Sequence, residues 1–206
     1  MTSVITGDII NSRKVPNPET WMIPLKKLLL RVGKTPAVWE IYRGDSFQVE
    51  VAEPGQSFLR SLQIKACVKG IKNLDVRMSI GIGAKNYSAQ KISESNGEAF
   101  INSGEMFDQL KKMKENMAVK TPWPDLDREL NLMISLAAIA MDSWTPVSAE
   151  MVALSLAYRH HSQTDLGKRL GRTQSSISER QTRAHYKEIM ELERFYRSKI
   201  EDHLSA

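Results

Sequence analysis

The chain has 206 residues, with 41% hydrophobic and 26% charged side chains and a formal net charge of +5. These values are ordinary for a folded protein that buries a core and has room for two modest domains. No stretch approaches the ~20 apolar residues of a membrane span, and no basic segment followed by an apolar run marks the start of the chain. We therefore expect a cytoplasmic protein with no membrane partner.

The first part of the chain alternates between strand and helix patterns. Apolar residues recur at every second position in some segments and at three-and-four spacing in others. The pattern predicts a strand at 2–10, a helix from 16 to 33, a hairpin at 39–52, a helix from 54, a strand at 74–83 and a helix at 99–113. This order favours an α+β fold with one sheet covered by helices. Cys67, the only cysteine, lies on the apolar side of its helix, so we expect a small core residue with no disulfide and no redox role.

A proline-rich segment interrupts this alternation. Pro122 and Pro124 flank Trp123, and the residues after them lack strand periodicity. We therefore predict a domain boundary here, with an α+β domain at 1–120 and an all-helical domain at 121–206. The expected helices of the second domain are 126–141, 148–160, 163–170 and 173–183, the last running on to about residue 200.

Two acids are placed where they can meet. Asp8 comes near the end of the first strand, and Asp45 lies at the tip of the hairpin turn. If the first strand lies beside the hairpin, both carboxylates converge at one end of the sheet. Paired carboxylates favour a hard divalent cation, and Mg²⁺ commonly uses one or two carboxylates with substrate phosphate oxygens. The alternative is that Asp45 only makes the turn and Asp8 only ends a strand.

Residues 163–182, QTDLGKRLGRTQSSISERQT, have the spacing of a helix-turn-helix. Leu166 and Leu170 precede Gly171, and Ile177 follows six residues after that glycine, so three apolar side chains can close a small core around a left-handed turn. Thr173 is a favourable N-cap for the second helix. The alternative is a helical hairpin used only for packing, and glycine at 167 and arginine at 180 depart from the usual pattern.

The composition around this motif favours double-stranded DNA as a partner. Residues 159–187 contain seven Lys/Arg against two Asp/Glu. Amides and hydroxyls at the start of a recognition helix can pair with base edges, while cations meet phosphates. The predicted DNA-binding residues are Lys168, Arg169, Arg172, Thr173, Gln174, Ser175, Ser178 and Arg183.

Four segments of the first domain, in order, resemble class III nucleotidyl cyclases. They are Asp8-Ile9 at the end of the first strand, Gly44-Asp45 in the hairpin, the strand VRMSIGIG at 76–83 and the segment GEAFIN at 97–102. The resemblance covers about the first 115 residues and implies a ferredoxin-like, cyclase-like sheet. It also implies that Asp8 and Asp45 bind Mg²⁺ or Mn²⁺, and that a nucleotide or another phosphorylated ligand lies against Ile9, Ile10, Asn11, Ser12, Arg13 and Arg43.

Other cyclase positions are not matched. The base-recognition lysine corresponds to Ile41, and the transition-state asparagine and arginine fall on Ile101 and Glu105, although Asn102 is adjacent. Loss of an arginine that stabilises phosphoryl charge normally costs orders of magnitude in rate. The sequence thus keeps a metal and phosphate cradle without the groups of a known cyclase.

The whole chain, including RGDSFQ and the terminal helix-turn-helix, resembles the bacterial SatD-like family. Our leading hypothesis is a DNA-binding regulator whose cyclase-like domain senses a nucleotide or phosphorylated ligand. The alternatives are a metal-dependent nucleotide phosphoester enzyme with a helical docking domain, and an interaction adaptor that uses neither site.

The last helix favours a homodimer. It carries an apolar stripe of Ile189, Leu192, Tyr196 and Ile200, which is more than a helix-turn-helix needs to fold. The alternative is that the stripe packs against residues 130–138 of the same chain.

Overall fold

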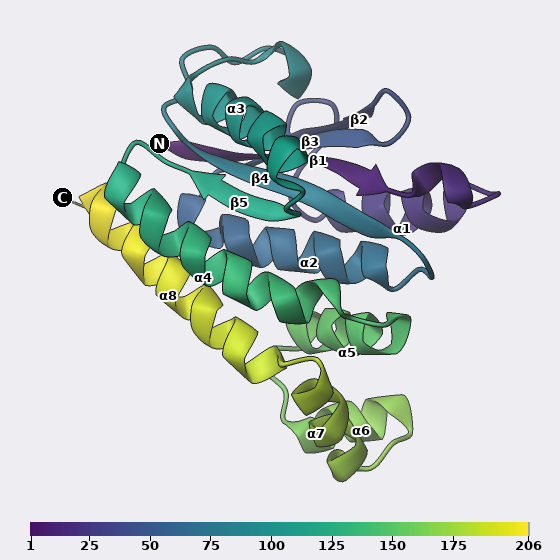
Figure 1. The fold of residues 1–206 in the computed structure, drawn as a ribbon. Coiled ribbons are helices and arrows are strands. Elements are labelled where there is room, and N and C mark those ends of the chain that lie inside the picture. Colours follow the sequence, from purple (N-terminus) through teal and green to yellow (C-terminus); the bar gives the residue numbers. More distant parts are fainter. Residues whose placement is uncertain (206) are drawn as a thin grey trace.

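A computed structural model describes residues 1–205, which form an α+β fold around a five-stranded mixed sheet (Figure 1). The strand order is β2-β3-β1-β4-β5, and only the β4–β5 pair is parallel. The strands are β1 (Thr2–Ile10), β2 (Trp39–Tyr42), β3 (Ser46–Val51), β4 (Asp75–Gly83) and β5 (Met117–Lys120). The expected strand at 2–10 and hairpin are confirmed, and β1 lies between the hairpin and β4.

Helices cover both faces of the sheet because the side chains of β1 alternate between two apolar environments. Ile5 and Ile9 belong to the core cluster that includes α2 (Ser57–Lys69), with α1 (Glu19–Leu29) beside it. Val4, on the opposite face, packs with residues of α3 (Glu98–Met113). At Gly81 of β4 a Cβ atom would lie 2.2 Å from the backbone of α3, so only glycine allows this close approach.

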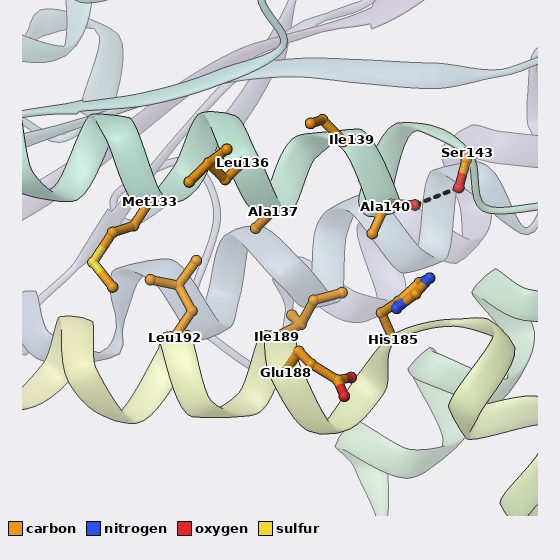
Figure 2. A pocket seen from close by; sticks show the side chains of 10 residues that line it. All are labelled: Met133, Leu136, Ala137, Ile139, Ala140, Ser143, His185, Glu188, Ile189 and Leu192. Carbon is orange, nitrogen blue, oxygen red and sulfur yellow. Dashed lines mark hydrogen bonds between the residues drawn. The ribbon is translucent and has the colours of Figure 1, made fainter.

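The remaining helices are α4 (Pro124–Asp142), α5 (Pro146–Ala157), α6 (Gln163–Leu170), α7 (Gln174–Arg183) and α8 (Tyr186–Ser205). The helices α4 and α8 run side by side, and α6 and α7 lie at one end of the molecule, far from the sheet (Figure 1). Met133 and Ala137 of α4 point toward Ile189 and Leu192 of α8 (Figure 2). Within residues 1–205, no helix combines the length and the apolar character that crossing a membrane requires.

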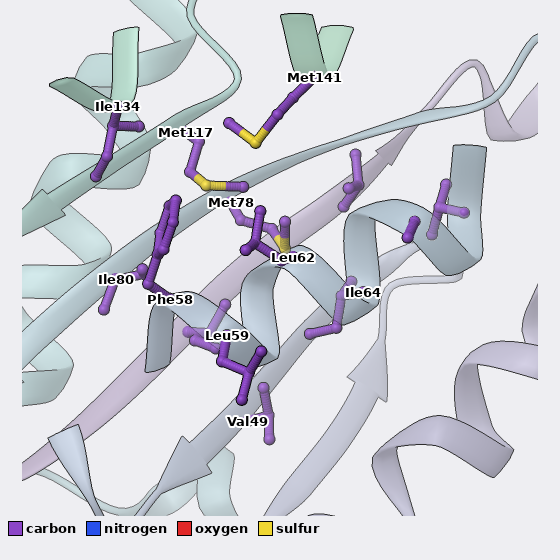
Figure 3. Close-up of a cluster of buried hydrophobic side chains, with 14 of the residues drawn as sticks. Val49, Phe58, Leu59, Leu62, Ile64, Met78, Ile80, Met117, Ile134 and Met141 are labelled. Atoms are coloured by element: carbon purple, nitrogen blue, oxygen red, sulfur yellow. The ribbon is translucent and has the colours of Figure 1, made fainter. Parts of the chain in front are cut away.

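One hydrophobic core crosses the proposed boundary at 120/121. Phe58 and Leu62 of α2, Met78 of β4, and Ile134 and Met141 of α4 belong to the same cluster of buried side chains (Figure 3). Helix α4 therefore completes the core on the α2 side of the sheet. The division into two domains remains a prediction, and any such domains share their apolar interior.

The expected continuation of the 173–183 helix to residue 200 is wrong. Helix α7 ends at Arg183, and α8 starts at Tyr186 after His185, whose backbone is left-handed with φ 52°. The indole N–H of Trp144 donates to the carbonyl of Ala184 at 2.9 Å, which satisfies a group left free by the break. The chain therefore changes direction between the two helices.

The apolar stripe of α8 packs on its own chain, so the argument for a dimer from this stripe is wrong. Ile189, Leu192, Tyr196 and Ile200 are all buried within the single chain. The Tyr196 ring stacks on Phe58 of α2 with centroids 5.4 Å apart, and its hydroxyl shares a hydrogen bond of 2.8 Å with Ser57. Helix α8 thus stabilises the monomer fold.

Candidate functional site

Asp8 and Asp45 lie at the same end of the sheet. Asp8 is directly opposite Ser46, the first residue of β3, and Asp45 immediately precedes that strand. The amide of Ile9 donates to the Asp45 carbonyl at 3.1 Å, which fixes the hairpin tip against the end of β1. The two acids are therefore at the same end of the sheet, as expected from the sequence, and Asp8 is on the face that α3 covers.

The Asp8 carboxyl is held in an environment that opposes its charge. Its Oδ1 atom is buried and has no hydrogen-bond partner within residues 1–205. Burial raises the pKa of Asp8 above its ordinary value, while Arg77 and Lys111 pull the pKa down and Asp45 raises it further. The Arg77 Nη1 atom is 3.9 Å from Asp8 Oδ2, so the two charges attract each other without forming a hydrogen bond. A buried acceptor that lacks a donor suits an additional cation or ligand.

Asp45 lies in the hairpin turn between β2 and β3 and is hydrogen-bonded to the loop that follows β1. Its Oδ2 atom accepts a hydrogen bond of 2.6 Å from the Ser12 hydroxyl. Asp8 and Asp45 supply two carboxylates, and no cluster of three or more His, Cys, Asp or Glu that could hold a metal occurs in the described part of the chain. The pair fits Mg²⁺ or Mn²⁺ only in the mode where a phosphorylated ligand and water complete the coordination.

The predicted phosphate-binding residues divide into two groups. Asn11 has a left-handed backbone with φ 65°, and Ser12 begins a short 3₁₀ turn. Among residues 1–205, the amides of Asn11, Ser12 and Arg13 donate to no protein acceptor, so they can receive an anion. Ile9 is buried and Ile10 half-buried, and both are paired in the β1 ladder, so their side chains are part of the sheet.

Arg43 lies apart from this loop. It is exposed, has φ 52° at the hairpin tip, and lines a cavity of about 490 Å³ with Met22 and Lys26 of α1. Arg77 and Lys111, which do face Asp8, were missed because their approach depends on strand register and on the placement of α3. The only available sequence signal was a charged residue at an inward position of a buried strand.

The positions aligned with cyclase catalytic groups have structural roles. Ile101 is exposed, and Glu105 pairs with Lys120 on β5. Asn102 is buried, and its amide donates to the Ile82 carbonyl at 2.8 Å, which ties α3 to β4. Asn102 therefore does not replace the missing transition-state group.

Helices α6 and α7 form a small unit with its own apolar centre. Leu166 and Ile177 are buried together with Met151 of α5, and Leu170 packs against them. Gly171 ends α6 with φ 61°, and the Thr173 hydroxyl accepts from the Ser176 amide at 3.2 Å to cap α7. At Gly167 a Cβ would lie 2.7 Å from the Arg172 carbonyl oxygen, so the closeness of the turn requires glycine in α6.

The predicted DNA-binding side chains are mostly exposed, but several have partners. Arg169 stacks on Tyr158 at 4.5 Å, and Arg183 pairs with Glu179 at 3.2 Å. Gln174 donates to the Gln163 side chain. Lys168 and Arg172 are exposed and make no ion pair with residues 1–205.

The serine and threonine hydroxyls at the start of α7 are partly engaged. Ser175 shares a hydrogen bond of 3.0 Å with Thr173, and the half-buried Ser178 accepts through its carbonyl from Thr182 at 3.0 Å. The first of these bonds lies at the start of α7 and the second in its later half, and neither uses the Ser178 hydroxyl.

An apolar groove of about 700 Å³ lies between α4 and α8 (Figure 2). On the α4 side its lining includes the small residues Ala137, Ala140 and Ser143. The outer side of α4 carries an exposed row of large apolar residues, namely Leu132, Leu136 and Ile139, which are 63%, 61% and 74% exposed. Such a row is uncommon on a free surface and marks a candidate interface.

A scan against protein-family models found no matching family, and a search of curated proteins found no similar protein.

Proposed function

We propose that this chain is a DNA-binding transcriptional regulator whose helices α6 and α7 form a helix-turn-helix. The observation that carries the proposal is the pair of short helices joined by three residues, with Gly171 in the left-handed region and Leu166 and Ile177 closing the angle between them. This combination of turn and small core is typical of the motif. The unit lies at one end of the molecule, where a duplex can reach it (Figure 1).

The charge distribution supports contact with phosphates. Seven Lys/Arg and two Asp/Glu occur in residues 159–187, and Lys168 and Arg172 are exposed. A DNA ligand implies a cytoplasmic location. The proposal agrees with the resemblance to the SatD-like family.

The N-terminal part is proposed to sense a nucleotide or another phosphorylated ligand with Mg²⁺ or Mn²⁺. The order β2-β3-β1-β4, antiparallel throughout, is that of a ferredoxin-like sheet and supports a cyclase-like fold. The free amides after β1 and the orphaned Asp8 oxygen support the site itself. A bound metal would neutralise charge between the two carboxylates and the phosphate.

Dimerisation is proposed through the outer face of α4. A two-fold interface uses the same patch on both partners, so the patch must be complementary to itself and contain both protruding side chains and a groove. Leu136 and Ile139 project beside a groove lined by Ala137 and Ala140, so a second copy of this chain fits the face. A dimer would present two α7 helices to two half-sites.

Direct binding measurements test the DNA proposal. The full chain is titrated into labelled random duplex and into a pool of genomic fragments, and anisotropy is recorded at 50 mM salt. We expect binding that weakens steeply as salt increases, because cations released from phosphates drive association. Absence of binding to both DNAs at this salt concentration would contradict the proposal and favour a protein-interaction adaptor.

A metal-dependent nucleotide phosphoester enzyme is the second candidate, favoured by the convergence of Asp8 and Asp45 alone. Incubation with a panel of nucleoside triphosphates and Mg²⁺ or Mn²⁺, followed by chromatography, distinguishes the two. Turnover that disappears in Asp45→Asn would support the enzyme, whereas binding without turnover supports a sensor. The structural roles of Glu105 and Asn102 lead us to expect no turnover.

A further inference from the structure

A second polar cavity lies away from Asp8 and Asp45, where α2 meets the connection between α5 and α6. Its volume is about 500 Å³, and its lining includes Arg60 of α2 and Arg159 of the connection. Three valines, at positions 32, 38 and 51, also line it and provide an apolar wall. Two guanidinium groups line this hollow, and the planar fork of each matches the geometry of phosphate oxygens.

The two arginines are compensated by carboxylates only in part. Within residues 1–205 neither Arg60 nor Arg159 forms an ion pair. Arg60 donates from Nη1 to Gln63 at 3.0 Å, but its Nε is buried and has no acceptor. Burial and then repulsion from Arg159 lower the pKa of Arg60, and Glu53 opposes them only in part.

Two acids, Glu50 and Glu53, also line this cavity, but they are weak partners for the two arginines. Glu50 already accepts from Lys85 at 2.6 Å and from the Thr2 hydroxyl at 3.0 Å. Glu53 is exposed to solvent. Because Glu50 is engaged by Lys85 and Glu53 faces solvent, the two guanidinium groups can bind an external anion.

A neighbouring cavity of about 580 Å³ shares Arg159 and extends the basic surface toward α8. It is lined by Lys187, Arg194 and Arg197, of which Arg197 is already paired with the buried Glu193. Tyr186 and Met190 offer an apolar wall on this side. Arg159 thus lies between two hollows that each combine cations with an apolar surface.

We propose that Arg60 and Arg159 bind a phosphate group of a phosphorylated small molecule, whose remaining part occupies one of the two adjoining cavities. The fork of a guanidinium matches phosphate oxygens, and the buried Arg60 Nε gains the acceptor it lacks. The concave shape and limited volume favour a small molecule over a duplex.

The location gives this site a connection to α6 and α7. The second cavity is lined by Gln163 of α6 and Gln181 of α7 as well as by residues of α8. Gln181 donates to Ser155 of α5 at 2.8 Å, and Gln163 donates to Gln181 at 2.8 Å. A ligand here would touch the elements that set the orientation of α6 and α7, and it would do so whether or not these helices bind DNA.

Calorimetric titration with pyrophosphate in the presence of EDTA tests the site, because the chelator removes any metal-dependent binding at Asp8 and Asp45. We expect saturable binding that Arg159→Gln weakens at least tenfold, since the variant removes the charge and the hydrogen bonds that the guanidinium gives to phosphate oxygens. Arg159 is exposed, so this variant keeps the fold. Arg128→Gln, an exposed change of the same charge on α4, should bind as the wild type does.

Arg60→Lys provides a second, charge-preserving variant. It keeps the positive charge but loses the planar fork, so binding should weaken by several-fold. If wild type shows no binding up to 10 mM pyrophosphate, or if Arg159→Gln and Arg60→Lys both bind with unchanged affinity, the proposal is overturned. It is also overturned if Arg159→Gln weakens only duplex binding, because the surface would then serve DNA phosphates.

Discussion

The ammonium of Lys65 lies 2.6 Å from a carboxylate oxygen of Asp142 and is completely buried. Its Nζ is also 2.9 Å from Asp75, and Lys69 bonds to the same Asp75 at 3.0 Å and to the Asp142 carbonyl at 2.6 Å. These contacts join α2, β4 and the last turn of α4. Polar bonds therefore reinforce the apolar core that the sheet and α4 share.

Removing this ammonium should destabilise the whole chain. In Lys65→Met, Asp75 and Asp142 lose a buried partner, and breaking such a pair typically costs about 3 to 5 kcal/mol. We expect a loss near 3 kcal/mol, because Asp142 retains some contact with water. Urea unfolding measures it, and the exposed Lys112→Met should change the free energy of unfolding by less than ~0.5 kcal/mol. Equal effects of the two variants would contradict the prediction.

Two glycine-to-alanine changes should have opposite signs. Gly104→Ala in α3 meets no atom within 4 Å and should stabilise the chain by about 0.5 to 1 kcal/mol, because alanine favours the helix. Gly167→Ala places a methyl 2.7 Å from the Arg172 carbonyl oxygen, and overpacking costs about 1 to 3 kcal/mol. Thermal unfolding of both variants is sufficient, and stabilisation by Gly167→Ala would contradict the prediction for this turn.

The Asp8 carboxyl predicts a specific pH dependence. Burial raises its pKa in the folded chain, so its contribution to stability is fully present below its ordinary pKa and is lost as pH rises through the folded pKa. Asp8→Asn should therefore raise Tm at pH 7, and the difference from wild type should shrink as pH falls toward 4. Asp108→Asn, exposed on α3, is the matched control with little effect. A Tm difference that stays constant with pH would assign the effect to shape instead of charge.

The α7 helix predicts two kinds of DNA-binding variant. Arg172→Ala and Arg183→Ala should weaken binding to every duplex and reduce the salt slope by roughly one unit each. Gln174→Ala should cost about 1 to 3 kcal/mol on a preferred site and little on random duplex, because an amide can pair with adenine. To pair with adenine, the Gln174 side chain must first break its hydrogen bond to the Gln163 side chain. Anisotropy over a salt series measures these effects, and an equal loss on all sequences for Gln174→Ala would exclude base recognition.

The α4 face predicts the oligomeric state. We expect light scattering at tens of micromolar to report a dimer, a concentration at which an interface of micromolar affinity forms. Leu136→Asp should give a monomer with an unchanged Tm, because Leu136 is exposed in the single chain. Leu204→Asp, at a partly exposed position near the end of α8, should leave the dimer intact. A monomeric wild type at this concentration would contradict the proposed interface on α4.

Most elements of the fold were predictable because their apolar periodicity is long and regular. Strand β1 matches the predicted 2–10, and helix α6 matches 163–170. Strand β5 was not predicted, since four residues that are mostly buried beside β4 carry no alternating pattern. The break at His185 was not predicted for a different reason. The Ala184 carbonyl accepts a hydrogen bond from Trp144, which is 40 residues away in sequence, and the residues around Ala184 carry no sign of that contact.

The candidate site was predictable only in part. The convergence of Asp8 and Asp45 follows from the hairpin pattern and the placement of β1. The charges around Asp8 do not, because Arg77 and Lys111 reach it from β4 and α3 through tertiary packing. Likewise, both α4 and α8 carry apolar residues at helical spacing. Which apolar row is buried and which is exposed depends on the helix face that meets the rest of the chain, and the spacing does not give that.

The close approach at Gly81 fixes α3 on the sheet opposite Val4, four residues along β1 from Asp8. A Cβ atom there would lie 2.2 Å from both the Ala99 carbonyl oxygen and the Ser103 nitrogen, so α3 rests directly on β4 with no space between them. The contact holds the first turns of α3, whereas the α3 residue that faces Asp8 is Lys111, near the other end of the helix. A side chain at position 81 would therefore push α3 away from β4 and change the position of Lys111 relative to the Asp8 carboxyl.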